Sequence, residues 1–92
     1  MSDFDWDEAN RSHIARHSVS VSEAEDANQI FPMEVDSYIV DGELRIEEVG
    51  QTRTGRVLKI VYAIRGEKIR VLAAYDAPPI LKQLYDRYRV SQ

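Results

Sequence analysis

The chain lacks cysteine altogether and has no long apolar run, and each absence removes a class of function. Without thiols there are no disulfides, no thiolate catalysis and no zinc–thiolate site. No apolar stretch approaches the roughly 20 residues that a membrane-spanning helix needs. The start, "MSDFDWDEA", is acidic, whereas a signal peptide needs a basic start and an apolar stretch. We therefore expect a soluble cytoplasmic protein with no membrane partner.

Basic residues are scarce in the first half of the chain, and acidic residues are scarce in the second. Residues 1–50 carry 13 acids and three bases, a net charge of −10, whereas residues 51–92 carry three acids and nine bases, a net charge of +6. Two interpretations follow. Either the halves neutralise one another across the fold, or the basic half binds a partner with negative charge, such as nucleic acid. The length fits a single domain, residues 1–92.

Two helix signals come first in the chain. Asp5 or Asp7 is expected to cap a helix at about 7–17, and Ser22 and Glu25 form a capping box for a second helix at about 23–30. The second helix is expected to turn four apolar residues inward: Ala24, Ala27, Ile30 and Phe31.

Strand signals follow, and a last helix closes the chain. "MEVDSYIV" and "LRIEEV" flank the turn Asp41-Gly42, and two β-rich runs flank Gly66-Glu67, which fits a two-residue hairpin turn. Asp76 is expected to cap the last helix, whose apolar residues recur at helical spacing. The predicted fold is α+β in the order ααββββα. Two N-terminal helices and a C-terminal helix pack on a small antiparallel sheet of about four strands.

The hairpin around Gly66-Glu67 sorts its side chains onto two faces. In an uninterrupted register Arg65 faces Lys68 and Leu58 faces Tyr75, and alternate residues share a face. The face expected to meet the helices holds Leu58, Ile60, Tyr62, Ile64, Ile69, Val71, Ala73 and Tyr75. The other face holds the cations Lys59, Arg65, Lys68 and Arg70, with Val61, Ala63, Leu72 and Ala74 between them.

Four like charges on one sheet face repel one another. A partner with negative charge, either RNA phosphate or an acidic protein segment, explains the arrangement; a solvated outer face that blunts a sheet edge is the alternative. Arg53 and Arg56 flank a glycine loop and are candidates for phosphate contact, although cations that merely keep a loop soluble fit equally well.

His13 and His17 are the only histidines, and they lie four residues apart. Two histidines at this spacing still need a third protein ligand to hold a metal, so we predict no metal site. His17 has a sufficient structural role at a helix C-terminus, where a cation meets the helix dipole.

Two stretches resemble BrnT-type toxins. "FDWDEANRSHIARHSVSVSEAE" is similar to the opening of that family, with its W-D pair, a short helix ending in a basic residue plus His, and an "E-E-A" helix. "GQTRTGRVLKIVYAIRGEKIRVLAAYDA" resembles its second half: G-x-[ST]-x-x-G-R, an apolar strand, R-G-x-x-I-R, and a strand ending in [ST]-A-R. Ser18 stands where the family has glycine, and Ala73-Ala74-Tyr75 stands where it has [ST]-A-R.

The resemblance implies a RelE-like fold and a ribonuclease toxin of a type II toxin–antitoxin pair, which cuts RNA without a metal or other cofactor. It implies a BrnA-like antitoxin as partner. The expected assembly is either a homodimer of this chain or a toxin–antitoxin heterotetramer. By position, Arg65 and Arg70 match the basic strand positions of the family, and Arg53 and Arg56 lie in its glycine loop. Together with the cationic face, the candidate catalytic residues are Lys59, Arg65, Arg70 and Tyr75, and the candidate RNA-binding residues are Arg53, Arg56 and Lys68. Because the family arginine is replaced by Tyr75, whose predicted register points it toward the core, a catalytically degenerate binding module is the alternative.

Overall fold

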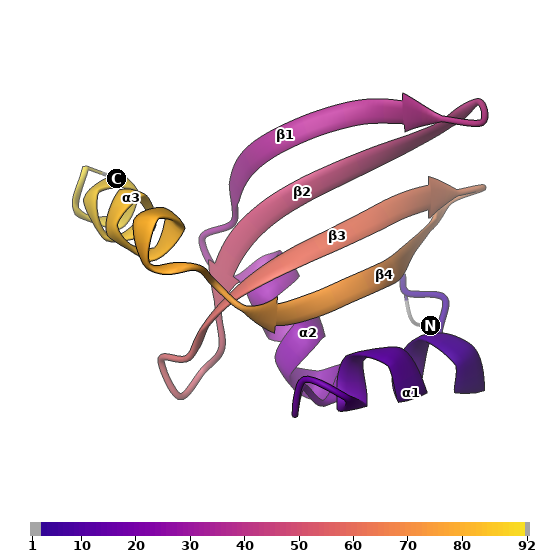
Figure 1. Cartoon of the computed structure of the whole chain (residues 1–92), viewed down its shortest axis with the longest axis horizontal. Helices are drawn as coiled ribbons and strands as arrows, with labels where there is room; N and C mark the ends of the chain where they lie inside the picture. Colours follow the sequence, from indigo (N-terminus) through magenta and orange to yellow (C-terminus); the bar gives the residue numbers. More distant parts are fainter. Residues whose placement is uncertain (1–2, 92) are drawn as a thin grey trace.

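The structure is a computed structural model that describes residues 3–91, and the predicted α+β fold is confirmed (Figure 1). Within this range the elements follow in the order ααββββα, and the four antiparallel strands lie in the order β1-β2-β3-β4. Their bounds are α1 Glu8–Ala15, α2 Val21–Gln29, β1 Met33–Val40, β2 Glu43–Gln51, β3 Val57–Arg65, β4 Lys68–Asp76 and α3 Pro79–Val90. No helix of residues 3–91 is long and apolar enough to cross a membrane.

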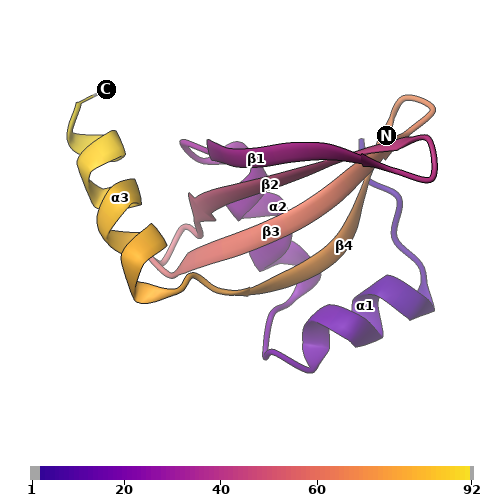
Figure 2. The ribbon, with the colours of Figure 1, turned by 45° about the horizontal axis from the view of Figure 1, so that its top comes forward.

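Helices α1 and α2 cover one face of the sheet, which we call the inner face (Figure 2). The main core lies between them and strands β3 and β4. It is built from buried side chains of every one of these elements: Phe4, Ile14, Val19, Ala24, Ala27, Leu58, Ile60, Val71 and Ala74. The opposite, outer face is left free of α1 and α2, so the polar residues of the strands can meet solvent there.

The capping of both N-terminal helices differs in part from the prediction. Asp7 caps α1, as expected, and closes a box with Asn10. The cap of α2 is Ser20, whose hydroxyl accepts from the Glu23 amide, so the predicted box of Ser22 and Glu25 is wrong. "SVSEAE" contains two overlapping Ser-x-x-Glu patterns, and the earlier one operates. Phe31 was predicted to face inward but is 56% exposed.

The β3–β4 hairpin contains a bulge that the uninterrupted register missed. The predicted pairs from Arg65–Lys68 to Tyr62–Val71 are confirmed. Beyond them the register shifts by one residue, so that Lys59 pairs with Tyr75 instead of Ala74. Directly opposed residues share a face, and a one-residue slip exchanges the faces. The predictions that Tyr75 points to the core and Ala74 points outward are therefore wrong: Ala74 is buried in the core.

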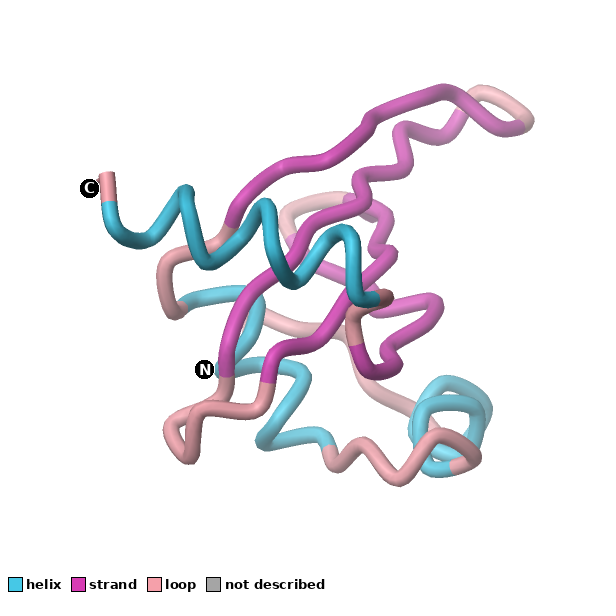
Figure 3. Tube along the Cα trace, turned by 60° about the vertical axis from the view of Figure 1, so that its left-hand side comes forward, coloured by secondary structure: helices cyan, strands magenta, loops and turns pink. Residues whose placement is uncertain are grey.

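Helix α3 lies at the end of the sheet where β2 finishes and contacts that strand (Figure 3). Its N-cap is Pro78, which supplies no side-chain bond, so the prediction that Asp76 caps this helix is wrong. Tyr85 is fully buried, and its hydroxyl donates to the Ile30 carbonyl over 3.4 Å. Ile80 and Leu84 from the predicted apolar stripe are instead 64% and 45% exposed.

Candidate functional site

The outer face carries a polar cluster around Lys59, near the start of β3. The Lys59 Nζ lies 2.8 Å from Glu47 Oε1 on β2 and 5.9 Å from the ring centroid of Tyr75 on β4. The Tyr38 hydroxyl on β1 donates to Glu47 Oε2 over 2.6 Å. We call Lys59, Glu47, Tyr38 and Tyr75 the Lys59 cluster. All four strands contribute one residue each to it.

Electrostatics in the Lys59 cluster hold its charges in place. The hydrogen bond to Glu47 raises the pKa of Lys59, so its ammonium keeps its proton. In turn, the bonds from Lys59 and Tyr38 lower the pKa of Glu47, which stays a carboxylate. The hydrogen bond to Glu47 also raises the pKa of Tyr38. The cluster therefore places the Lys59 ammonium beside the Tyr75 phenol. A fixed cation can stabilise developing negative charge, and a phenol can donate a proton.

His17 joins this cluster from outside the sheet. Its ring centroid lies 5.7 Å from that of Tyr75, and 6.4 Å from that of His13. The residue is exposed and follows the last turn of α1. The sequence led us to treat His17 as structural, because its contact with Tyr75 depends on the hairpin bulge and on the path of the chain after α1, and no local pattern encodes either.

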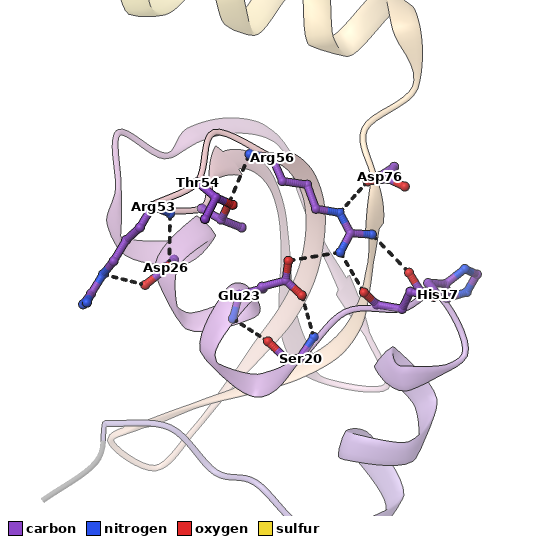
Figure 4. A network of polar contacts seen from close by, with 10 residues as sticks. His17, Ser20, Glu23, Asp26, Arg53, Thr54, Arg56 and Asp76 are labelled. Carbon is purple, nitrogen blue, oxygen red and sulfur yellow. Dashed lines mark hydrogen bonds and ion pairs between the residues drawn. The ribbon is translucent and has the colours of Figure 1, made fainter.

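Arg56 holds that path by joining four segments (Figure 4). Its Nε donates to Asp76 over 2.8 Å at the end of β4, and its Nη1 donates to Glu23 in α2 over 3.2 Å. Its Nη1 and Nη2 also donate to the carbonyls of Ser18, over 2.7 Å, and of His17, over 3.2 Å. Its pKa is raised mainly by the bond to Asp76. Every nitrogen of the guanidinium thus bonds within the chain, so Arg56 acts as a structural clamp here.

The loop from Gly50 to Arg56 carries the G-x-[ST]-x-x-G-R pattern, and several of its residues stabilise the fold. A Cβ at Gly50 would lie 1.7 Å from the Ala27 carbonyl oxygen, so only glycine lets α2 approach β2. The Thr52 hydroxyl accepts from the Arg56 amide over 3.1 Å. Arg53 pairs with Asp26 at 3.3 Å, yet its side chain remains 84% exposed and available to a partner.

The cations near the hairpin turn also meet acids of the first half of the chain. Arg65 Nε donates to Glu43 over 2.6 Å, and Arg70 Nη1 lies 3.4 Å from Asp5 and 3.0 Å from Asp7. These bonds raise the pKa of Arg65 and of Arg70, and they lower the pKa of Glu43 and of Asp7.

Lys68 is exposed and makes no ion pair with any residue that the structure describes. Every other cation among the predicted catalytic and RNA-binding residues pairs with an acid. The ion pairs bear out the interpretation in which the two halves neutralise one another. Individual bases of the second half pair with individual acids of the first half. Among the predicted cations, Lys68, which has no ion pair within the described residues, and Arg53, whose side chain is 84% exposed, are the most accessible to a partner.

The predicted catalytic residues fall into two groups. Lys59 and Tyr75 are paired at one end of the hairpin, whereas Arg65 lies six residues beyond Lys59 in β3, about 20 Å away along an extended strand. Arg70 lies between these ends, opposite Ala63. A single phosphate cannot contact both Lys59 and Arg65. Within residues 3–91, no group of three or more His, Cys, Asp or Glu side chains is placed to hold a metal ion.

The fold and this site define a small α+β domain in which a lysine and a tyrosine of the sheet lie near a histidine that follows α1, with further cations along the β3–β4 hairpin. The family model described as "Ribonuclease toxin, BrnT, of type II toxin-antitoxin system" matches residues 6–79, which is most of the chain. The chain therefore belongs to this family of ribonuclease toxins, and the family implies an RNA target and an antitoxin protein as partner. A search of curated proteins gave no match.

Proposed function

We propose that this protein is a metal-independent endoribonuclease toxin that inhibits translation in the cytoplasm and is neutralised by a BrnA-like antitoxin. Membership of the BrnT family supports the reaction class. The observation that carries the proposal is the pairing of Lys59 with Tyr75 on the outer face, where a cation and a phenol lie beside one another. Both residues are partly exposed to solvent.

The chemistry needs three events at one phosphodiester. The ribose 2′-oxygen attacks phosphorus, negative charge builds on the phosphoryl oxygens, and the 5′-oxygen leaves with a proton. Lys59 is the group that stabilises the charge, because its ammonium is fixed by Glu47. Tyr75 is the group that protonates the leaving oxygen. Cleavage then yields a 2′,3′-cyclic phosphate and a 5′-hydroxyl end.

The remaining predicted residues serve different parts of the substrate. Arg70, Arg65 and Lys68 follow the outer face from the middle of the hairpin to its turn, so we propose that they bind phosphates one or more nucleotides away from the cut. Arg53 is proposed to contact the RNA near the Gly50–Arg56 loop. Arg56 is proposed to act as a clamp, because its donors already bond within the chain.

Purified protein with RNA in the presence of EDTA tests the reaction. We expect cleavage products with 2′,3′-cyclic phosphate ends, at a rate that EDTA does not change. Lys59→Ala and Tyr75→Phe should each slow cleavage by about 10²- to 10⁴-fold. Arg11→Ala removes the same charge as Lys59→Ala, but from an exposed position of α1, and should cleave at the original rate. Cleavage by both site variants at the original rate would overturn the assignment.

Translation and the antitoxin are tested separately. Addition of the protein to a cell-free translation reaction should stop synthesis, and Tyr75→Phe should not. Coexpression with a BrnA-like protein should restore synthesis and give a complex that co-purifies. A protein that degrades RNA but is not bound or inhibited by any BrnA-like protein would contradict the proposed partner while leaving the reaction standing.

The ion pairs favour a second candidate, a catalytically degenerate member that binds without cutting. Five of the seven predicted site residues are cations already paired with acids: Arg53, Arg56, Lys59, Arg65 and Arg70. Pairing lowers the positive potential that RNA would meet. Stable association with an antitoxin, together with intact RNA at every ionic strength tested, would support this candidate over the first.

A further inference from the structure

We propose that His17 is a catalytic residue that accepts the proton of the attacking 2′-hydroxyl, and that Arg56 is the positioning residue that holds it there. The inference rests on the proposed ribonuclease function, which by itself leaves the 2′-hydroxyl without a base. Lys59 and the other cations keep their protons, and Tyr75 is used to protonate the leaving oxygen. An imidazole is the side chain best suited to accept a proton near neutral pH.

Three reactive groups converge at Tyr75. The centroid of the His17 ring lies 5.7 Å from that of the Tyr75 ring, and the Lys59 Nζ lies 5.9 Å from the Tyr75 centroid. They come from the end of α1, from β4 and from β3. A base, an acid and a cation near one another are the set that in-line cleavage of a phosphodiester by its own 2′-hydroxyl requires.

The His17 backbone is hydrogen-bonded within the chain, and its ring nitrogens make no hydrogen bond to any residue between 3 and 91. The His17 amide donates to the Ile14 carbonyl over 3.0 Å, and the His17 carbonyl accepts from Arg56 over 3.2 Å. Figure 4 shows the ring directed away from this network. In the described part of the chain its ring contacts are with the rings of His13 and Tyr75.

Arg56 sets where the ring stands. Its guanidinium bonds the carbonyls of both His17 and Ser18 while it also bonds Asp76, which directly follows Tyr75 in β4. The same side chain therefore fixes the backbone that carries the base and the strand end that carries the acid. Figure 4 shows the guanidinium lying between the two segments.

The step balances in atoms and charge. A neutral His17 nitrogen takes the 2′-hydroxyl proton, and the electron pair of that O–H bond forms the new O–P bond. The bond from phosphorus to the 5′-oxygen breaks, and the 5′-oxygen takes the Tyr75 proton. The resulting Tyr75 phenolate lies beside the Lys59 ammonium, which stabilises it. Water then carries the proton from the imidazolium back to the phenolate, so no other reactant is consumed.

Several charged or titratable groups lie around His17. His13 approaches from α1 and Tyr75 from β4. The Arg56 guanidinium bonds its carbonyl from the loop, Asp76 binds that guanidinium, and Lys59 lies beyond the Tyr75 ring. Cleavage should accordingly fall at acid pH, because a protonated imidazole cannot accept the 2′-hydroxyl proton.

The test compares His17→Gln with His13→Gln in the full chain. Both histidines are exposed residues of the same segment, so neither change should alter folding. We expect His17→Gln to lower the cleavage rate by about 10²- to 10⁴-fold and to remove the acid limb of the pH–rate profile. His13→Gln should retain both the rate and the limb within about twofold. Equal rates and equal pH profiles for His17→Gln and the unaltered protein would overturn the inference.

Arg56→Lys separates positioning from chemistry. It should lower the rate but keep the acid limb, because the base is still present but less well placed. Loss of the limb in Arg56→Lys, in protein with an unchanged circular dichroism spectrum, would contradict a positioning role. Failure of the proposed function looks different: RNA stays intact with the unaltered protein. That result overturns both proposals, whereas cleavage that survives His17→Gln overturns this one alone.

Discussion

Ser18 is a serine in a backbone conformation that suits glycine. Its φ is +57°, in the left-handed region, where an L-residue with a Cβ is disfavoured by about 1–2 kcal/mol. Glycine, which has no Cβ, would occupy this place without that cost, and the geometry shows why the conformation is needed. The chain must reverse between α1 and α2 while the Ser18 carbonyl still reaches Arg56 at 2.7 Å.

Ser18→Gly is expected to stabilise the protein. Glycine relieves the left-handed strain but has more freedom in the unfolded chain, so a net gain of about 0.5–1 kcal/mol in the free energy of unfolding is expected. Urea unfolding at pH 7 measures it. Ser18→Ala keeps the Cβ and serves as the matched control, with no gain. A stability gain of the same size in both variants would show that strain at Ser18 is not the cause.

Glu48 is a carboxyl buried on the inner side of β2, with 5% of its surface exposed. It accepts from the Asn28 amide over 2.7 Å and from the Tyr62 hydroxyl over 3.2 Å, and neither partner is a cation. Burial therefore raises its pKa, and burial together with Glu48 raises the pKa of Tyr62 to about 12. The charged form of Glu48 costs folding free energy, so the carboxylate opposes stability at neutral pH.

Glu48→Gln is expected to raise the free energy of unfolding at pH 7 by on the order of 1 kcal/mol, because glutamine keeps two polar partners without the charge. The sign follows from a folded-state pKa above the ordinary value. Protonation of Glu48 stabilises the fold fully at pH values below the ordinary, unfolded-state pKa. This stabilisation is lost as pH rises through the folded-state pKa. The gain of the variant should thus disappear at acid pH. Unfolding curves that show the same difference at pH 3.5 and pH 7 would contradict this account.

At the scale of elements, the contact between α2 and β2 depends on one position. Gly50 approaches the Ala27 carbonyl so closely that an added Cβ would lie 1.7 Å from its oxygen, and both partners are backbone or bonded directly to it. No side-chain rotation relieves such a clash. The helix must move, and the core between α2 and the sheet must open with it.

Gly50→Ala is expected to lower the free energy of unfolding by about 3 kcal/mol or more. Gly42→Ala is the control, since its added Cβ meets nothing within 4 Å and only its φ of +79° opposes the change. It should cost about 1 kcal/mol. Thermal unfolding followed by circular dichroism measures both, and equal losses in the two variants would show that close packing at Gly50 is not decisive.

At the scale of the whole molecule, the acidic first half and the basic second half hold one another. Most of the ion pairs join an acid before residue 51 to a base after it, including Lys59–Glu47, Arg65–Glu43 and Arg70–Asp7. The pKa is lowered for the paired or hydrogen-bonded carboxyls of Asp7, Glu23, Glu43, Glu47 and Asp76.

Acid is therefore expected to destabilise the fold. A carboxyl whose folded-state pKa is depressed stabilises the fold above its unfolded pKa of about 4, and this stability is lost as pH falls through the folded-state value. The urea midpoint should fall steadily below about pH 4.5. Glu43→Gln removes one such carboxyl and should flatten the fall. A midpoint that stays constant from pH 6 to pH 3 would contradict a role for these pairs in stability.

Local pattern determined the elements but not how they face one another. The order of helices and strands, the turn at Gly66 and the first pairs of the β3–β4 hairpin follow from periodicity and turn residues near in sequence. The start of α2 was misplaced because "SVSEAE" holds two capping patterns, and the pattern that begins at Ser20 operates.

The candidate site divides in the same way. The sequence by itself determined which residue types are present: cations on one hairpin, carboxylates in the first half and a BrnT-like pattern across both. Tertiary structure decided which of them meet, because a bulge of one residue turned Tyr75 to the side of Lys59 and the Arg56 clamp brought His17 to Tyr75. Both decisions depend on contacts between residues far apart in the chain, and no local preference encodes those.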